Sequence, residues 1–291
     1  MSIGWSNYHA HTKFCDGRAT MEESVERAIK EGIKVFGFSS HAPVPFDTVW
    51  TMKHELLDDY FETIELLKER YKGQISILKS LEVDYIPYVV NPLSYKRYNL
   101  DYVIGSVHFV GKYSDGTPWS FDGGVEEFLK GFEAIYKGDI KACVKRYYAL
   151  VRDMVENYTP TILGHFDKIW MHNSETQLFD VEADWYVAEV DETLAAIKRS
   201  GVIVEINTKG FDRGGKIFPH VNLFKKLAIL QIPITMNSDC HHIDKLTLGF
   251  DVVADELLKA GYTTFKEFVD GQWIDLPFTS KGIDFGNSLN F

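Results

Sequence analysis

The chain has 291 residues, of which 45% are hydrophobic and 25% charged, so it can bury a sizeable core without disulfides. A formal net charge of −11 argues against a protein that binds nucleic acid through phosphate contacts, although bound metal ions can reverse the local sign for a small anionic substrate. No apolar run approaches the roughly 18 residues of a membrane span, and the first residues lack the regions of a signal peptide. The three cysteines form no CxxC pair, which favours a cytoplasmic protein over a disulfide framework.

Strand-like apolar runs alternate with helix-like segments along the first half of the chain. The first run, from Ile3 to Tyr8, leads to a helix that begins at a capping box at 20–23 and ends near Gly32. A second helix is predicted at about 52–71 from the spacing of its apolar residues. Further strands are predicted at 33–39, 75–81 and 101–107.

The second half continues the alternation after a stretch of different composition. Residues 111–124 are rich in Gly, Asp, Ser and aromatic residues, and we interpret them as a long loop. Helices are predicted at 125–158 with a break near Gly138, at 183–199 with Gly201 as stop signal, at 221–230 and at 251–260, and strands at 161–164, 202–206 and 232–236. The remaining tail has a mixed pattern.

About seven strand-then-helix units predict a parallel sheet with βαβ crossovers. Residues that can bind metal fall just after these strands: His9, His11, His41, Glu82, His108, His165, Asp239 and His241. In a (β/α) barrel the carboxyl ends of all strands meet at one face, whereas an open doubly wound sheet brings fewer of them together. We therefore expect an α/β fold, a distorted (β/α)7 barrel over a single domain of residues 1–291, with a metal site at the carboxyl ends.

His9 and His11 introduce this pattern. In an extended chain residues i and i+2 point to the same side, so both imidazoles can reach one ion. Taken alone, such a pair is more often a surface or turn feature, His41 can be a hydrogen-bonded core histidine, and Glu82 can form a salt bridge. Asp16 precedes a glycine and is an ordinary turn signal. Metal binding is favoured because six strand ends all finish in ligand-type residues.

The remaining histidines and cysteines need no such role. We interpret His54, His172 and His220 as surface or loop residues, and His242 as a neighbour of the site without a function in it. Cys15 and Cys240 lie beside ligand positions and could bind metal themselves, but they suit small packing residues better.

The ordered motifs resemble those of the PHP (polymerase and histidinol phosphatase) superfamily and, within it, the histidinol-phosphate phosphatases of the PHP type. The motifs span about residues 5–250 and are His9-Ala10-His11, Asp16, Ser40-His41, Glu82, Ser106-Val107-His108, Gly164-His165-Phe166-Asp167 and Ser238-Asp239-Cys240-His241. The segment from Glu205 to Thr208, with Arg213 and Pro219 after it, is also similar to that branch.

The resemblance implies a distorted barrel with three divalent metal ions. The first ion would take His9, His11, Glu82 and Asp239, the second Asp16, His41 and His241, and the third Glu82, His108 and His165, with Glu82 bridging. Some relatives have His where this chain has Asp16. Mixed histidine and carboxylate ligands suit Zn, Mn or Fe, and the sequence does not choose among them.

The same resemblance implies a phosphate clamp at Arg213, since a guanidinium can bind phosphate oxygens in a bidentate manner. Without the resemblance, a solvent-exposed loop arginine would be the simpler interpretation. Phosphatases of this branch often carry a second arginine shortly after the GHxD motif, where this chain has residues 168–172. Lys168 or His172 could replace that arginine.

The implied activity is metal-dependent hydrolysis of a small phosphate monoester, namely L-histidinol phosphate to L-histidinol and phosphate in histidine biosynthesis. The hypothesis is in-line attack by a metal-bridging hydroxide, with Asp16, His41 or His241 assisting protonation of the leaving alkoxide.

Three alternatives stay open. The chain could be a phosphoesterase of this superfamily acting on a nucleotide, a sugar phosphate or an oligonucleotide end, or a metal-binding module without turnover. A barrel deaminase also begins with an HxH motif, but its Lys or His bridge pattern is not found. The loop at 111–124 could act as a lid over the site, and the oligomeric state does not follow from these patterns.

Overall fold

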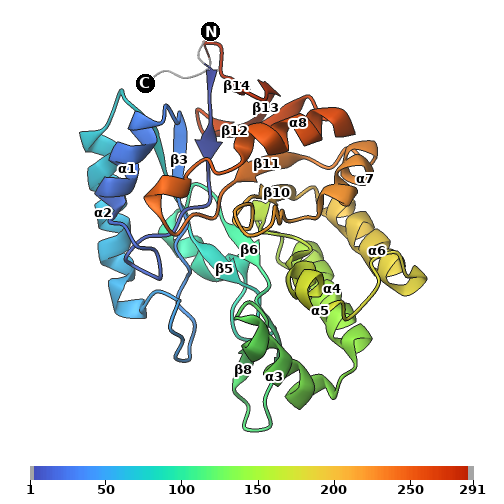
Figure 1. Cartoon of the computed structure of the whole chain (residues 1–291). Helices are drawn as coiled ribbons and strands as arrows, with labels where there is room; N and C mark the ends of the chain where they lie inside the picture. Colours follow the sequence, from blue (N-terminus) through green and yellow to red (C-terminus); the bar gives the residue numbers. More distant parts are fainter. Residues whose placement is uncertain (1–2, 288–291) are drawn as a thin grey trace.

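Residues 3–287 of this computed structural model are described, apart from the side chains of 174 and 175, and they form an α/β fold (Figure 1). Two sheets of short parallel strands have the orders β2-β3-β4 and β11-β10-β9-β6-β5. These strands are β2 (Ser6–Asn7), β3 (Val35–Phe38), β4 (Ser76–Lys79), β5 (Glu82–Asp84), β6 (Ile104–Ser106), β9 (Ile162–Leu163), β10 (Ile203–Asn207) and β11 (Ile234–Asn237). The predicted α/β class is confirmed.

Two isolated bridges join these sheets just beyond the strand ends. Ala10 pairs in parallel with Cys240, which links the segment after β2 to the segment after β11. His41 pairs in parallel with Glu82 and links the segment after β3 to β5. Strands β3, β10 and β11 are buried along their whole length, as expected for parallel strands that are covered on both faces.

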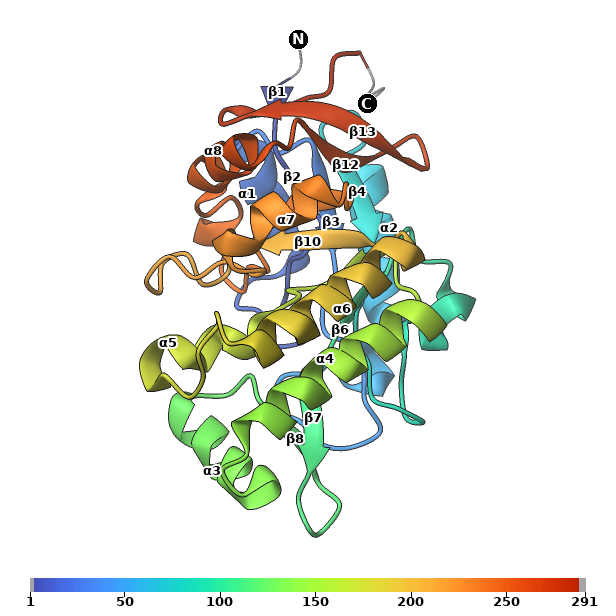
Figure 2. The same cartoon turned by 90° about the vertical axis from the view of Figure 1, so that its right-hand side faces the viewer.

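Helices cover the outside of the sheets. They are α1 (Met21–Lys30), α2 (Leu57–Arg70), α3 (Val125–Tyr136), α4 (Ile140–Asn157), α5 (Asn173–Thr176), α6 (Asp184–Ser200), α7 (Phe224–Ile229) and α8 (Phe250–Ala260), with 3-10 turns η1 (His54–Leu56), η2 (Pro92–Tyr98), η3 (Lys168–His172), η4 (Val221–Leu223) and η5 (Ile243–Lys245). Helices α4 and α6 lie side by side (Figure 2). None of the described helices combines the length and apolar character needed to cross a bilayer.

The predicted helix signals are confirmed where the chain supplies a specific cap. Thr20 and Glu23 form the reciprocal capping box of α1. Gly201 ends α6 with φ of 72°, and Gly138, with φ of 82°, separates α3 from α4. Both glycines adopt a left-handed conformation that residues with a Cβ rarely take.

The stretch at 111–124, predicted as a loop, instead contains most of a β-hairpin. Strand β7 (Phe109–Lys112) pairs with β8 (Pro118–Ser120), and the turn between them includes Gly116 with φ of 88°. The aromatic side chains that suggested an open loop are buried, since Trp119 is 3% exposed and Phe121 is fully buried. Their packing supplies the apolar contacts that an isolated hairpin lacks.

The tail after α8 forms an antiparallel meander that the mixed pattern did not predict. It consists of β12 (Thr264–Val269), β13 (Gln272–Thr279) and β14 (Gly282–Asp284), and β14 pairs with β1 (Ile3–Gly4). The single strand predicted at 3–8 is therefore divided between two sheets, with β1 in the meander and β2 beside β3. Figure 1 shows the meander at the end of the molecule where the N-terminal strand begins.

Candidate metal centre

The first arm of the site follows strand β2. His9 and His11 are 0% and 3% exposed. The Ala10–Cys240 bridge, just beyond the ends of β2 and β11, fixes their position relative to the segment after β11. The backbone N–H of His11 donates to the carbonyl oxygen of Cys240 at 2.9 Å. This pairing brings His11 Nε2 within 3.0 Å of Asp239 Oδ1, although more than 200 residues separate them in the chain.

A group of four ligand-type side chains lies at the open side of the site. Ligand atoms of His11, Asp16, His41 and His241 all lie within 4.8 Å of one another. His241 Nε2 is 3.2 Å from Asp16 Oδ2, and His41 Nε2 is 3.9 Å from Asp16 Oδ1. The side chains of Asp16 and His241 are 30% and 21% exposed, so a ligand in solution can reach this group.

Glu82 occupies the centre of the site and is 1% exposed. It is the first residue of β5 and stands three residues after the end of β4, as His41 stands three residues after the end of β3. Its Oε2 lies 3.2 Å from His9 Nε2 and 2.9 Å from His41 Nδ1. Its Oε1 lies 2.9 Å from His165 Nε2 and 3.7 Å from His108 Nε2. The two carboxylate oxygens therefore face different imidazoles, which is the arrangement that a bridging ligand needs.

Several of these atoms are buried without a hydrogen bond. Among the described residues, His9 Nε2, His11 Nε2, His41 Nδ1 and Glu82 Oε2 have no hydrogen-bond partner. Buried polar atoms normally have such a partner, and here they converge on one another. Imidazole nitrogens and carboxylate oxygens are also the donors that Zn and similar divalent ions prefer. The residues therefore fit divalent ions.

A buried carboxylate that was not predicted as a site residue orients this centre. Glu205 in β10 is 0% exposed and accepts a hydrogen bond from His9 Nδ1 at 2.6 Å and from the backbone N–H of His165 at 2.7 Å. Asn207 and Asn237 donate their amide N–H groups to the same carboxylate at 2.9 and 3.1 Å. Hydrogen bonding at Nδ1 leaves Nε2 of His9 free to bind an ion.

Asp84 plays the same part for His108. Its Oδ1 lies 2.9 Å from His108 Nδ1, so Nε2 of that ring faces His165 Nε2 at 3.1 Å. In the sequence, Glu205 was visible as a single carboxylate inside an apolar strand segment, and Asp84 as a second carboxylate two residues after Glu82. A buried charge of this kind needs a partner, and that requirement was the available signal.

The charges of the site keep its carboxylates ionised but shift the pKa values of its histidines in opposite directions. Burial would lower the pKa values of His9 and His108, but the carboxylates of Glu205 and Asp84 respectively raise them. Burial alone would raise the pKa of Glu82, but His41 and His9 hold that pKa well below its usual range. Burial likewise opposes ionisation of Asp239, yet the ammonium of Lys209 and the imidazole of His9 keep its pKa low. Burial lowers the pKa of His165 to about 4. The carboxylates are thus ionised at neutral pH, and His165 is neutral, as metal ligands must be.

A cleft of about 860 Å³ opens over this centre. Its lining includes Asp16, His41 and His241 from the centre, together with Lys209 and Arg213 from the segment between β10 and η4. Arg213, the predicted phosphate clamp, therefore lines the cleft that opens over the centre, and its role in phosphate binding stays a prediction. The other lining residues are Arg18, Val49, Trp50, Ser120, Asp122, Gly123, Glu127, Ser238, Asp239, Cys240, His242, Asp244, Lys245 and Leu248.

Lys168, the other predicted phosphate ligand, already has a partner. It is 2% exposed, and its Nζ lies 2.7 Å from Asp122 Oδ2 at the cleft wall. Asp122 Oδ2 in turn is 3.8 Å from His108 Nε2. The ion pair joins the segment after the β7–β8 hairpin to the 3-10 turn after His165, so a structural role accounts for the contacts of Lys168.

Four histidines were predicted to lie outside the site. His54 is exposed and His220 half-buried, in agreement with that prediction. His242 lines the outer cleft, and its Nδ1 accepts the backbone N–H of Asp244. The prediction was wrong for His172, which is 4% exposed and stacks on Phe128 with 4.4 Å between ring centroids. Its apolar neighbours Ile169 and Trp170 were the missed signal for burial.

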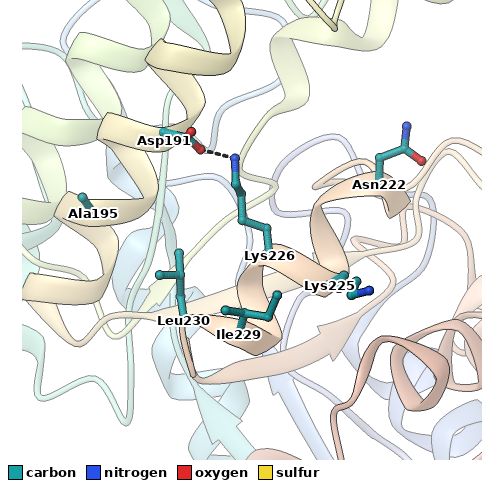
Figure 3. Close-up of a pocket in the computed structure, with 7 residues that line it drawn as sticks. All are labelled: Asp191, Ala195, Asn222, Lys225, Lys226, Ile229 and Leu230. Carbon is teal, nitrogen blue, oxygen red and sulfur yellow. Dashed lines mark hydrogen bonds and ion pairs between the residues drawn. The ribbon is translucent and has the colours of Figure 1, made fainter.

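A separate groove lies on the outside of the molecule, between α6 and α7 (Figure 3). It has a volume of about 550 Å³ and is lined by Asp191, Ala195, Asn222, Lys225, Lys226, Ile229 and Leu230. Lys226 forms an ion pair with Asp191 across it. None of the described residues that line this groove belongs to the predicted site.

Comparison with known proteins agrees with this geometry. The family model described as "PHP domain" matches residues 7–209, more than half of the chain and all predicted ligands except Asp239 and His241. The chain belongs to the PHP family. Curated relatives of this PHP protein include the "Probable histidinol-phosphatase" of Deinococcus radiodurans, 27% identical over 271 residues that cover 90% of this chain and 95% of the relative. They also include the "Histidinol-phosphatase" of Bacillus subtilis, 29% identical over 264 residues that cover 84% and 96%.

A solved structure also matches the PHP fold of this chain. Histidinol phosphate phosphatase from Lactococcus lactis, determined with Zn, L-histidinol and phosphate, superimposes with a TM-score of 0.65. The match covers 96% of this chain and 98% of that one at 20% sequence identity. At this identity the likeness establishes the shared fold.

Proposed function

We propose that the chain is a metal-dependent phosphate monoester hydrolase that converts L-histidinol phosphate to L-histidinol and phosphate. The observation that carries the proposal is the convergence of His9, His11, His41 and Glu82 with buried donor atoms that lack hydrogen bonds, under a cleft that also presents Arg213. The family, and the naming of curated relatives as histidinol-phosphatases, support this substrate.

Three divalent ions would fit the arrangement of ligands. We assign the first to His9, His11, Glu82 and Asp239, the second to Asp16, His41 and His241, and the third to Glu82, His108 and His165. Glu82 would bridge, because its two oxygens face different imidazoles. The donor set suits Zn, Mn or Fe. Such ions supply a hydroxide nucleophile near neutral pH and offset charge on phosphoryl oxygens.

The side chains of this chain would divide the remaining tasks. Arg213, at the rim of the cleft, would bind the phosphoryl oxygens through a planar pair of N–H donors. Asp16, His41 and His241 line the floor of the same cleft and are the candidates that can deliver a proton to the leaving alkoxide. Glu205 would hold His9 and the backbone of His165 in place.

The cleft is large enough for an amino-alcohol phosphate. Its volume of about 860 Å³ lies within the usual range for small-molecule sites. Trp50 contributes a ring edge-on to His41, with 4.6 Å between centroids, and forms an apolar wall for the organic part of the substrate. Glu127 adds an acidic group to the lining beside the Asp122–Lys168 ion pair, and this charge favours a leaving group with a positive charge.

The finer architecture follows from the same contacts. We propose that the two parallel sheets close into a distorted (β/α)7 barrel over a single domain, with β4 and β5 together serving as one strand. The Ala10–Cys240 and His41–Glu82 bridges support closure at both junctions of the sheets. We further propose a cytoplasmic location, which is supported by three cysteines that are all free thiols.

Phosphate release from L-histidinol phosphate tests this function directly. The protein is stripped with a chelator and reloaded with Mn or Zn, and the expected result is activity only after reloading. Glu82→Gln should lose both activity and bound metal, because one carboxylate serves two ions. Equal activity of stripped and reloaded protein would overturn the proposal.

A further inference from the structure

Lys209 reaches into the centre from the segment after β10. Its Nζ lies 3.1 Å from Asp239 Oδ1 and 3.4 Å from His241 Nε2. Its backbone N–H donates to Asn207 Oδ1 at 3.0 Å, which anchors the start of the segment. The side chain is 29% exposed and lines the same cleft as Arg213. An ammonium is therefore held at the floor of the cleft and is still accessible from solution.

The contacts of Lys209 differ from those of Lys168, the lysine predicted from sequence. The side chain of Lys168 is 3% exposed, and its ammonium is paired with Asp122 at 2.7 Å. The ammonium of Lys209 instead faces two groups that are themselves predicted metal ligands, Asp239 and His241. The lone pair of His241 Nε2 can serve either an ammonium or a metal ion, but not both. With ions present, the ammonium keeps Asp239 but loses His241 as an acceptor, and an anionic ligand in the cleft provides an acceptor for its remaining donors.

We propose that Lys209 is a second cationic ligand, beside Arg213, for the phosphoryl group of the substrate. This inference rests on the proposed function. An ammonium is a compact charge with three rotatable donors, so it can follow the oxygens of a phosphate group. The two cations lie four residues apart on one segment and line the same cleft, where Lys209 contacts the buried Asp239 and Arg213 is exposed.

The binding of inorganic phosphate tests this role without depending on turnover. Calorimetric titration with inorganic phosphate is compared for the Mn-loaded wild type, Lys209→Met and Lys209→Arg, and metal content is measured in each. Loss of a charge-assisted hydrogen bond should weaken phosphate binding by about 10- to 100-fold in Lys209→Met, with recovery of most of the affinity in Lys209→Arg. Lys225→Met is the matched control, because Lys225 is exposed in the groove beside α7, away from the cleft.

In steady-state kinetics with phosphate monoesters, Lys209→Met should raise KM by a larger factor than it lowers kcat. Unchanged phosphate affinity in Lys209→Met, or a loss that follows a loss of bound metal, would overturn the inference and assign Lys209 to holding Asp239. Absence of phosphate binding by the wild type would overturn it as well. If phosphate binding depends on Lys209 but L-histidinol phosphate is not hydrolysed, the inference holds and the proposed substrate is wrong.

Discussion

Replacing Glu205 with Gln should weaken metal binding although Glu205 is not a predicted metal ligand. The carboxylate accepts four hydrogen bonds, from His9, His165, Asn207 and Asn237, and all four donors are N–H groups. A glutamine keeps the shape but presents an N–H₂ group to donors whichever way its amide is turned. At least two contacts are therefore lost, and His9 no longer has a charged acceptor at Nδ1.

The expected size follows from these contacts. Removal of the partner that orients a ligating histidine typically costs about 10- to 100-fold in metal affinity, equivalent to about 1.4–2.7 kcal/mol. Unfolding of the metal-free protein should become easier by about 1–3 kcal/mol, since buried donors next to the new amide are left unpaired. In the wild type, burial alone would raise the pKa of Glu205, but the imidazoles of His9 and His165 lower it. Glu205 is therefore ionised at neutral pH.

The assay is competition for Zn between the protein and a chelator of known affinity. Glu189→Gln is the control, because Glu189 is 8% exposed and pairs with Arg152 on the outer helices, away from the centre. We expect weaker Zn binding in Glu205→Gln and none of this effect in Glu189→Gln. If Glu205→Gln and Glu189→Gln both bind Zn with the affinity of the wild type, the role assigned to Glu205 is refuted.

Three further predictions concern metal, pH and the buried ion pair. Chelator-treated protein should melt at a lower temperature than protein reloaded with Mn or Zn, because ions that bind only the folded state add about 2.7 kcal/mol at a hundredfold excess over Kd; an identical melting temperature would count against bound ions. Burial raises the pKa of Glu267, which accepts a hydrogen bond from Tyr8, from 4.5 to about 8. The stability contributed by the protonated Glu267 is therefore complete below pH 4.5 and is lost as pH rises toward 8. In denaturant titrations over this pH range, the free energy of unfolding should fall less in Glu267→Gln than in the wild type, and parallel curves would exclude the assignment. Asp122→Asn should lower the free energy of unfolding by about 3–5 kcal/mol, since it leaves the buried Lys168 ammonium without its counter-charge, and a change below 1 kcal/mol would contradict a structural ion pair.

The elements that the sequence predicted well are those with local signals. The capping box at Thr20 and the left-handed glycines at 138 and 201 fix helix ends whatever the rest of the fold does. The predicted ligands come together because the carboxyl ends of parallel strands meet at one face, and this rule needs no knowledge of side-chain contacts. The alternation of strands and helices was enough to apply it.

The features that were missed depend on contacts between distant segments. Trp119 and Phe121 resemble residues of an open loop until packing buries them, which turns the segment into a hairpin. One exception is the β12–β13 hairpin of the C-terminal meander, whose Asp270-Gly271 turn between alternating residues was a local signal. The pairing of β14 with β1 joins segments more than 270 residues apart. Lys168 was predicted as a phosphate ligand, but its ammonium pairs with Asp122, a contact that spacing along the chain cannot give.

The most direct test of the central claim is kcat/KM for L-histidinol phosphate in the metal-loaded protein, measured beside nucleotide and sugar monophosphates. A value far above those of the other phosphate monoesters is predicted, since the cleft combines Arg213 with an apolar wall at Trp50 and an acidic group at Glu127. Similar low values for all of these esters would contradict the assigned substrate.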